Sequence, residues 1–210
     1  MTKGKPLQPA KTERRARLAR LIGDVLEPIL AGGESYADIS VERLITAVDI
    51  SRSTFYVYFS DKGELLQAIG EDVTLDLAEA GAHWFELPLD ADRDDLRAAL
   101  VPLFETYRRH RQVLQAITEA ASYDVNIRTL HQALVDRAAT GLADHLRVQQ
   151  AAQAVPADLD PDAAARWLVW MLERGLYQLF GPADATMGEH LLDTVTALVW
   201  RALYEGHHRS

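Results

Sequence analysis

The sequence contains no cysteine, which excludes disulfide bonds, thiolate catalysis and zinc sites built on thiolates. It also lacks the run of roughly 18 uncharged apolar residues that a membrane-spanning helix needs, so we predict no membrane partner. The first 20 residues are basic but have neither the apolar centre nor the cleavage site of a secretory signal peptide. We therefore expect a cytoplasmic protein.

The motifs of several large enzyme classes are missing as well. The chain has no G-x-S-x-G nucleophile turn, no H-E-x-x-H metal pair, no phosphate-binding glycine loop and no G-x-G-x-x-G fingerprint. The histidines are scattered, and an exposed chain end explains the adjacent His207 and His208 more simply than a metal site does. We predict a protein that is not an enzyme, with no catalytic residue, no cofactor and no metal.

Sustained strand-like alternation is also absent, whereas apolar residues recur with the 3.6-residue period of helices. The first apolar stripe, over residues 18–29, contains Pro28, so this helix should kink or stop there, and Gly32 and Gly33 should end it. A loop is expected over 149–160. The pattern predicts an all-α fold of about nine helices, with an N-terminal helix-turn-helix module of three helices followed by a larger helical domain.

Charge is distributed unevenly along the chain. Within residues 1–20, seven basic residues stand against Glu13 alone, which gives this arm a net charge of +6. Because the whole chain carries −9, the remainder carries −15. A basic arm on an acidic body fits a protein that presents one face to nucleic acid, although a solubilising tail would have the same composition. The basic residues are Lys3, Lys5, Lys11, Arg14, Arg15, Arg17 and Arg20.

The most informative segment spans residues 39–66 and reads ISVERLITAVDISRSTFYVYFSDKGELL. It predicts two short helices joined by a short turn, with Ser40 and Ser51 placed to cap them. A third helix follows, with Asp61 and Glu64 spaced as in a capping box. In a helix-turn-helix, the second short helix enters the major groove of DNA. A plain cluster of three helices with surface tyrosines is the alternative interpretation.

The stretch S-R-S-T-F-Y-V-Y-F-S-D-K-G-E-L-L resembles the recognition helix and following helix start of the TetR family of one-component regulators. Length and helix layout are similar to that family over the whole chain. The resemblance implies binding to double-stranded operator DNA, and arginine is the commonest bidentate reader of guanine. It implies base contacts for Arg52, Ser53 and Thr54, and phosphate contacts for Ser40, Ser51, Tyr56, Tyr58 and Lys62.

Asp49 departs from the family pattern, which usually has glycine in this turn. Aspartate tolerates the left-handed backbone conformation better than most residues, so the turn should survive. Its negative charge near DNA should lower the affinity.

We place the DNA-binding domain at residues 1–62 and a ligand-binding and dimerisation domain at residues 63–210. In the second domain, Glu173 and Arg174 interrupt the apolar stripe of a helix. A charge in such a stripe must be paired or lie at a cavity. Core packing with one ion pair and an apolar small-molecule cavity with few polar anchors both explain this pattern.

The segments H-R-Q-V and E-R-G-L-Y-Q-L-F make this domain similar to a subgroup of actinobacterial TetR-family repressors with a long aromatic-lined tunnel. Val169 and Leu172 stand where that subgroup has asparagines, so the ligand should be more apolar or held differently. The resemblance implies a pocket lined by Leu103, Tyr107, Leu134, Val169, Leu172, Glu173 and Tyr177.

The apolar stripes of the last two helices are wider than one face needs, which predicts a homodimer through a four-helix bundle. Such a dimer would place two recognition helices in successive major grooves, about 34 Å apart. Our leading hypothesis is a transcriptional repressor that a small, largely apolar inducer releases from its operator. A ligand-independent DNA-binding protein and a small helical enzyme or lipid carrier are the alternative hypotheses.

Overall fold

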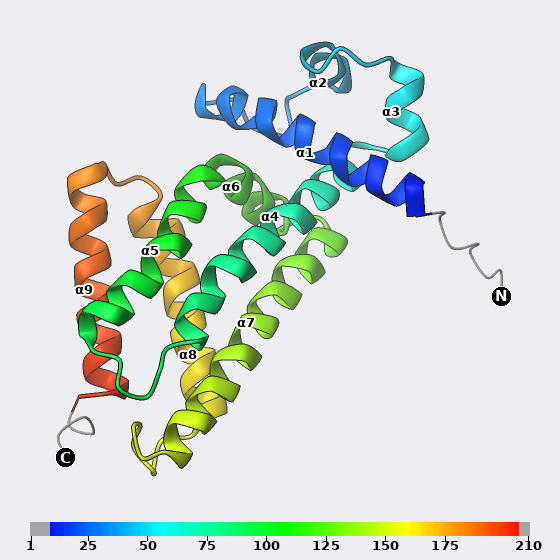
Figure 1. Cartoon of the computed structure of the whole chain (residues 1–210). Helices are drawn as coiled ribbons and strands as arrows, with labels where there is room; N and C mark the ends of the chain where they lie inside the picture. Colours follow the sequence, from blue (N-terminus) through cyan, green and yellow to red (C-terminus); the bar gives the residue numbers. More distant parts are fainter. Residues whose placement is uncertain (1–8, 206–210) are drawn as a thin grey trace. The chain divides into compact units, whose positions relative to one another are not determined.

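The computed structural model describes residues 9–205, and in that range the chain forms nine α-helices and one π-helical turn, with no strand (Figure 1). The all-α fold predicted from the sequence, with its N-terminal helix-turn-helix, is confirmed. The elements are α1 (Pro9–Ala31), α2 (Val41–Ala47), α3 (Arg52–Tyr58), α4 (Lys62–Phe85), α5 (Arg93–Arg109), α6 (Arg111–Ala120), α7 (Val125–Ala151), α8 (Pro161–Gly175), η1 (Leu176–Phe180) and α9 (Ala185–Leu203).

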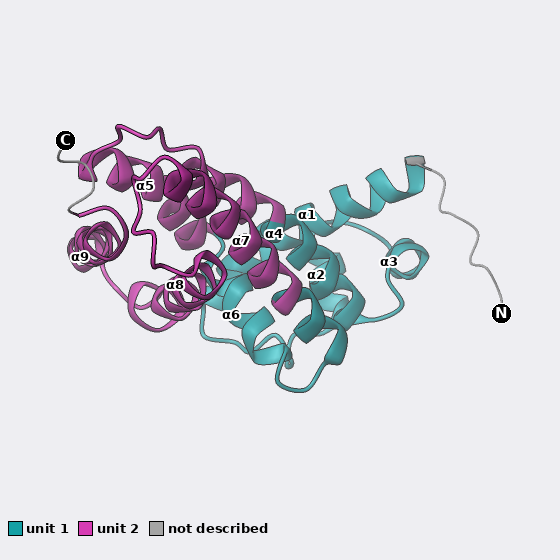
Figure 2. Ribbon diagram, turned by 90° about the horizontal axis from the view of Figure 1, so that it is seen from below, with its two compact units in different colours: residues 1–74, 110–131 teal, residues 75–109, 132–210 magenta. Residues whose placement is uncertain are grey.

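The chain divides into two compact units (Figure 2). The first unit comprises residues 1–74 and 110–131, and the second comprises residues 75–109 and 132–210. Both α4 and α7 therefore contribute to each unit. The division into these units differs from the predicted division after residue 62, because α6 and the start of α7 belong to the same unit as the N-terminal helices. The predicted boundary separates a DNA-binding domain from a ligand-binding domain, and this functional division stays a prediction.

Helix α1 begins earlier than the sequence predicted, and it ends at Ala31, directly before the two glycines that were predicted to end it. Its first two turns are almost entirely exposed, so they are polar on every side and carry no apolar stripe to detect. The helix also continues through Pro28 to Ala31. Because Pro28 lies in the last turn, its missing N–H removes only one bond near the helix end. Gly33, with φ of +90°, then turns the chain away.

In the first unit, α1 packs against α2 and α6. Phe55 and Phe59 are buried, as are Leu44 and Ile45, and the two phenylalanine ring centroids lie 5.4 Å apart. The Glu27 carboxylate of α1 accepts the first backbone N–H groups of α6, at 3.2 Å from Gln112 N and 3.1 Å from Val113 N. Burial raises the pKa of Glu27, although these N–H groups favour its charged form.

In the second unit, α5 packs along α9. The Arg97 guanidinium of α5 reaches two α9 carboxylates, at 2.7 Å from both Glu189 and Asp193. Helix α8 begins at Pro161, directly after the loop expected over 149–160, with Asp160 as its N-cap. Helix α7 extends to Ala151, so that loop is shorter than expected. None of the described helices is long and apolar enough to cross a membrane.

Candidate DNA-binding surface and ligand-binding domain

Ser40 and Ser51 occupy the N-cap positions that the sequence predicted. The Ser40 hydroxyl accepts the backbone N–H of Arg43 at 3.2 Å, and the Ser51 hydroxyl accepts that of Thr54 at 3.0 Å. The Ser51 hydroxyl also lies 2.8 Å from the hydroxyls of both Ser53 and Thr54. These bonds fix the start of α3, the end that a recognition helix turns toward base edges.

The turn between α2 and α3 contains Asp49 in the left-handed region, with φ of 52°. The backbone therefore adopts the conformation for which glycine is the usual residue, and aspartate tolerates it. The prediction that the turn survives this substitution is confirmed.

The exposed face of α3 carries Arg52, Ser53, Tyr56 and Val57. The Arg52 guanidinium pairs with the Glu42 carboxylate of α2 and lies over the Tyr56 ring, 5.6 Å from its centroid. Glu42 and Val57 belong to this surface, although sequence reasoning did not select them. Helical spacing indicates Val57, which lies four residues after Ser53 on the same face.

Thr54 and Tyr58 lie beside this face and are partly exposed. Both were predicted to contact DNA, Thr54 through base edges and Tyr58 through phosphate. Both contacts stay predictions.

Lys62 behaves differently from the other predicted contact residues. Its ammonium donates to three backbone carbonyls of the segment before α2, at 3.2 Å for Tyr36, 2.7 Å for Ala37 and 2.7 Å for Ile39. In return, the buried Tyr36 hydroxyl donates to the Lys62 carbonyl at 2.7 Å. The predicted phosphate contact is untested, but the structure shows that Lys62 has intramolecular partners.

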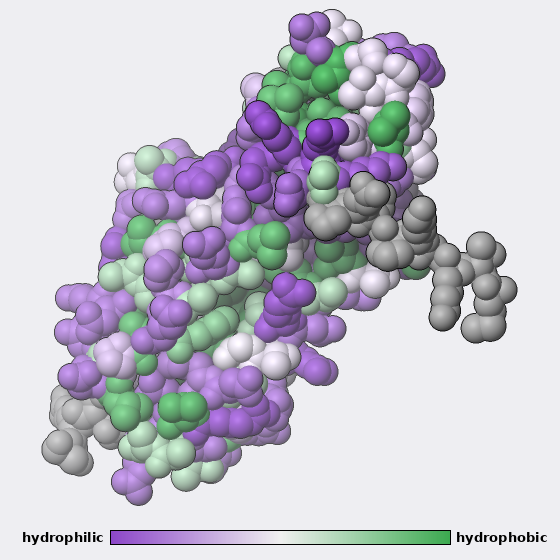
Figure 3. Space-filling model, turned by 45° about the vertical axis from the view of Figure 1, so that its right-hand side comes forward, coloured by the Kyte–Doolittle hydropathy of each residue, from purple (hydrophilic) through white to green (hydrophobic). Residues whose placement is uncertain are grey.

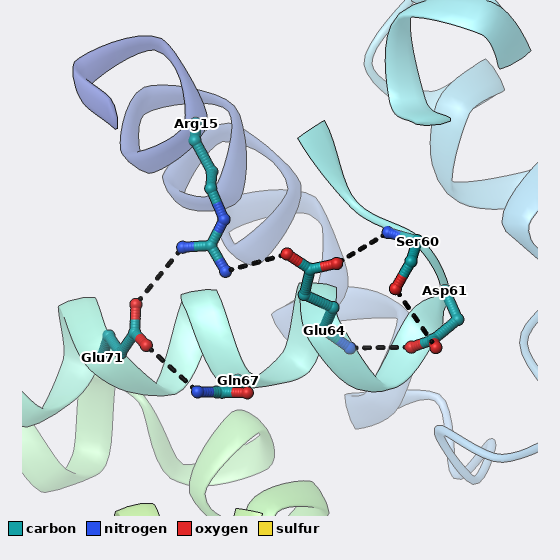
Figure 4. A network of polar contacts seen from close by, with 6 residues as sticks. All are labelled: Arg15, Ser60, Asp61, Glu64, Gln67 and Glu71. Carbon is teal, nitrogen blue, oxygen red and sulfur yellow. Dashed lines mark hydrogen bonds and ion pairs between the residues drawn. The ribbon is translucent and has the colours of Figure 1, made fainter. Parts of the chain in front are cut away.

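The start of α4 forms a capped turn that α1 contacts (Figure 4). The Asp61 carboxylate accepts the Glu64 N–H at 2.9 Å, and the Glu64 carboxylate accepts the Ser60 N–H at 2.8 Å. That backbone bond, assisted by Arg15 at 3.6 Å, lowers the pKa of Glu64. The capping box expected here is therefore present, with its return bond one residue earlier than usual.

Two arginines of the predicted basic arm pair with carboxylates of α4. Arg15 lies 3.4 Å from Glu71, and the Arg20 guanidinium forms two bonds to Asp72. These pairs reduce the positive charge that the arm presents to a polyanion. Lys3 and Lys5, like His207 and His208, lie outside the described residues.

The residues predicted to line a ligand pocket all belong to the second unit. Among them, Tyr107 and Leu172 are buried and the other five are partly exposed. The Glu173 carboxylate lies 3.5 Å from the neighbouring Arg174 Nε. The predicted set is Leu103 and Tyr107 on α5, Leu134 on α7, Val169, Leu172 and Glu173 on α8, and Tyr177 in η1.

Phe180, which sequence reasoning missed, lies at the centre of an aromatic group in the second unit. Its ring centroid lies 4.8 Å from that of Phe104 and 6.3 Å from that of Tyr107, and the Arg108 guanidinium lies 4.8 Å from it. Phe180 ends the π-helical turn η1, where the Gly181 N–H reaches the Leu176 carbonyl at 2.8 Å. Such turns often occur at functional sites.

Two family models match the chain. Residues 30–69 match bacterial regulatory proteins of the tetR family, and residues 96–205 match the C-terminal domain of the transcriptional regulator EthR. The HTH-type transcriptional regulator EthR of Mycobacterium tuberculosis strain H37Rv is 30% identical over 204 residues, which cover 93% of this chain and 94% of that relative. The chain belongs to the TetR family.

Solved structures of other regulators share this TetR-family fold. A transcriptional regulator from Saccharomonospora viridis in complex with choline has a TM-score of 0.69 at 18% identity, over 92% of this chain and 98% of that chain. A TetR-family regulator from Streptomyces coelicolor has a TM-score of 0.70 at 20% identity, over 90% and 80%. At these identities, the likeness concerns the fold alone.

As a member of the TetR family, the protein is a transcriptional regulator with an N-terminal DNA-binding domain. The family resemblance stated from the recognition-helix motif is thereby confirmed. The match of residues 96–205 also agrees with the subgroup suggested by E-R-G-L-Y-Q-L-F. The individual DNA and ligand contacts stay predictions.

Proposed function

We propose that the protein is a homodimeric repressor that binds operator DNA and is released by a small, largely apolar ligand. The observation that carries this proposal is the capped α2–turn–α3 module, which exposes Arg52 and Ser53 together on α3. In this arrangement α3 enters the major groove and places polar side chains against base edges.

The proposed contacts divide by chemistry. Arg52 is the strongest candidate for base reading, because a guanidinium can bond to guanine O6 and N7 together. Hydroxyls at the helix starts, and tyrosine hydroxyls on and beside the exposed face of α3, are suited to phosphate oxygens, and such contacts position the protein without reading sequence. We assign base contacts to Arg52, Ser53 and Thr54, and phosphate contacts to Ser40, Ser51, Tyr56 and Tyr58.

A dimer through α8 and α9 is supported by apolar side chains that the single chain leaves exposed. Trp167 is 79% exposed, and Met171 of α8 and Leu198 of α9 are also exposed. Figure 3 shows apolar patches among hydrophilic residues on one face of the molecule. Pairing of these helices in a four-helix bundle would remove such apolar area from water.

A ligand in the second unit is supported by the match to the EthR C-terminal domain and by the aromatic group around Phe180. The Saccharomonospora viridis regulator was solved with choline, so a related fold holds a small molecule. Val169 and Leu172 in this chain favour a more apolar ligand. The proposed lining is Leu103, Tyr107, Leu134, Val169, Leu172, Glu173 and Tyr177.

The first experiment titrates the protein against DNA flanking its own gene and against a scrambled duplex, each at two salt concentrations. We expect tighter binding to the native flank, and weaker, strongly salt-dependent binding to the scramble. Arg52→Ala should lose about 1–3 kcal/mol of binding free energy on the native flank and little on the scramble. Arg137→Ala removes an exposed arginine from the second unit and is the matched control.

An Arg52→Ala protein that binds its operator as tightly as wild type would contradict the assignment of base reading. Ligand release is tested separately by adding a panel of apolar compounds and recording the melting temperature. A compound that binds only the folded protein must raise that temperature, and it should also weaken operator binding. No shift across the panel would favour the ligand-independent DNA-binding protein.

A further inference from the structure

The Lys62 ammonium is the most fully bonded lysine nitrogen in the described first unit. An ammonium has three N–H donors, and three carbonyl oxygens of residues 36–39 lie 2.7–3.2 Å from Nζ. The same nitrogen lies 5.5 Å from the centroid of the Tyr36 ring. A bond to a DNA phosphate would therefore have to replace a bond that already exists within the chain.

Tyr36 completes the contact from the opposite side. It is 5% exposed, and its hydroxyl donates to the Lys62 backbone carbonyl at 2.7 Å. The two residues thus bind each other's segments reciprocally, through the Lys62 side chain in one direction and the Tyr36 side chain in the other. We call this arrangement, formed by Lys62, Tyr36, Ala37 and Ile39, the carbonyl clamp.

The carbonyl clamp joins two elements of the DNA-binding module. Lys62 is the first residue of α4, and Ile39 directly precedes Ser40, the N-cap of α2. The clamp therefore holds the entry of α2 against the start of α4, on either side of the helix-turn-helix. Any displacement of these carbonyls would move Ser40 and the helix that follows it.

We propose that Lys62 is a positioning residue, which fixes the segment before α2 through three carbonyls instead of donating to a DNA phosphate. This inference rests on the proposed operator binding. It reverses the role that the family motif implies for this lysine, because the implied role required a side chain available to DNA.

Substitution by arginine separates the two roles. Arginine keeps the positive charge and is well suited to phosphate, so a phosphate contact would survive Lys62→Arg. A planar guanidinium cannot direct three N–H groups from one compact nitrogen at three carbonyls, so the carbonyl clamp would be broken. Tyr36→Phe weakens the same clamp by removing one buried hydroxyl that has no access to DNA.

The experiment compares wild type, Lys62→Arg, Tyr36→Phe and the double variant, with Lys11→Arg as the same chemical change at an exposed lysine of α1. The operator is selected from a random duplex library with the wild-type protein, and melting temperatures verify that every variant is folded. In both single variants, the ratio of the affinity for the operator to the affinity for the scrambled duplex should fall about three- to tenfold, as expected for one or two lost hydrogen bonds. The double variant should lose no more than about twofold beyond either single variant, because both act on one contact.

Amide hydrogen exchange provides a readout that is independent of DNA. The backbone N–H groups of residues 36–43 should exchange faster in Lys62→Arg and Tyr36→Phe, and those of α3 less so. Wild-type preference and wild-type exchange in Lys62→Arg would overturn the proposal. The proposal would also be overturned if Lys62→Met weakened binding to the operator and to the scramble equally and lowered the salt dependence of the affinity by about one, because loss of a phosphate contact has these effects. Absence of any selected operator would instead refute the proposed function, and hydrogen exchange would still test the clamp.

Discussion

At the scale of single residues, the structure contains two non-glycine residues with positive φ among those it describes. Asp49 has φ of 52° in the turn between α2 and α3, and Gln153 has φ of 63° in the turn after α7. A left-handed conformation costs an L-residue roughly 1–2 kcal/mol, less for aspartate and asparagine. Glycine avoids this cost but loses more conformational entropy on folding.

We expect Asp49→Gly to raise the free energy of unfolding by about 0.5 kcal/mol, and Gln153→Gly by about as much or more, because glutamine has no short polar group to support the turn. Only Asp49→Gly should tighten DNA binding, and more so at low salt, since it removes a negative charge beside α3. Urea denaturation and duplex titration measure the two effects. A less stable Asp49→Gly protein would show that the aspartate supports the turn beyond its backbone conformation.

At the scale of elements, α4, α7 and α9 meet around a buried polar chain in the second unit. The Trp84 indole donates to the Tyr204 hydroxyl at 3.2 Å, and that hydroxyl lies 3.2 Å from His145 Nε2. His145 Nδ1 lies 2.9 Å from the Phe85 carbonyl. The carbonyl only accepts, so Nδ1 carries the proton, and in the neutral imidazole Nε2 then accepts from the Tyr204 hydroxyl. This order requires a neutral imidazole, and burial lowers the pKa of His145 accordingly.

Stability should therefore fall as the solution becomes acidic. The unfolded chain takes up the His145 proton at its ordinary pKa, about 6.5, whereas the folded chain resists it, so the free energy of unfolding decreases as pH falls below that value. We expect His145→Gln to show a shallower decrease in melting temperature between about pH 7.5 and 5.5 than wild type. Parallel curves for the two proteins would show that the buried network does not require a neutral histidine.

At the scale of the whole molecule, the proposed dimer links the second unit to DNA recognition. A single recognition helix covers one half-site, so a monomer lacks the second set of contacts that a two-fold operator offers. Trp167, with most of its surface in water, lies on the face of α8 opposite the buried Leu172. Aromatic side chains of this kind dominate the energy of many interfaces.

Trp167→Glu should place a charge in the proposed interface and convert the dimer to a monomer at micromolar concentration. Operator binding should weaken by at least about tenfold, while the circular dichroism spectrum stays helical. Val148→Glu, at an exposed apolar residue of α7, is the matched control and should remain dimeric. Light scattering and duplex titration measure both quantities, and a dimeric Trp167→Glu protein would place the interface elsewhere.

The sequence by itself determined the features that depend on neighbours a few residues apart. Ser40 and Ser51 were predicted as N-caps, and each accepts the backbone N–H three residues later. The helical periodicity and the recognition-helix motif likewise identified the fold class and the family. Such short-range hydrogen bonds and apolar stripes are set by local spacing, so they are readable without the rest of the chain.

Only the tertiary structure decided which distant groups meet. Lys62 bonds to carbonyls 23–26 residues away, and Glu27 caps a helix start 85 residues along the chain. The polar first turns of α1 have no apolar stripe, yet Arg15 contacts α4 from them. The motif contains the same lysine whether phosphate or carbonyl oxygens accept its hydrogen bonds. The sequence therefore cannot identify the acceptor, because the acceptor depends on which backbone carbonyls folding brings close to the ammonium.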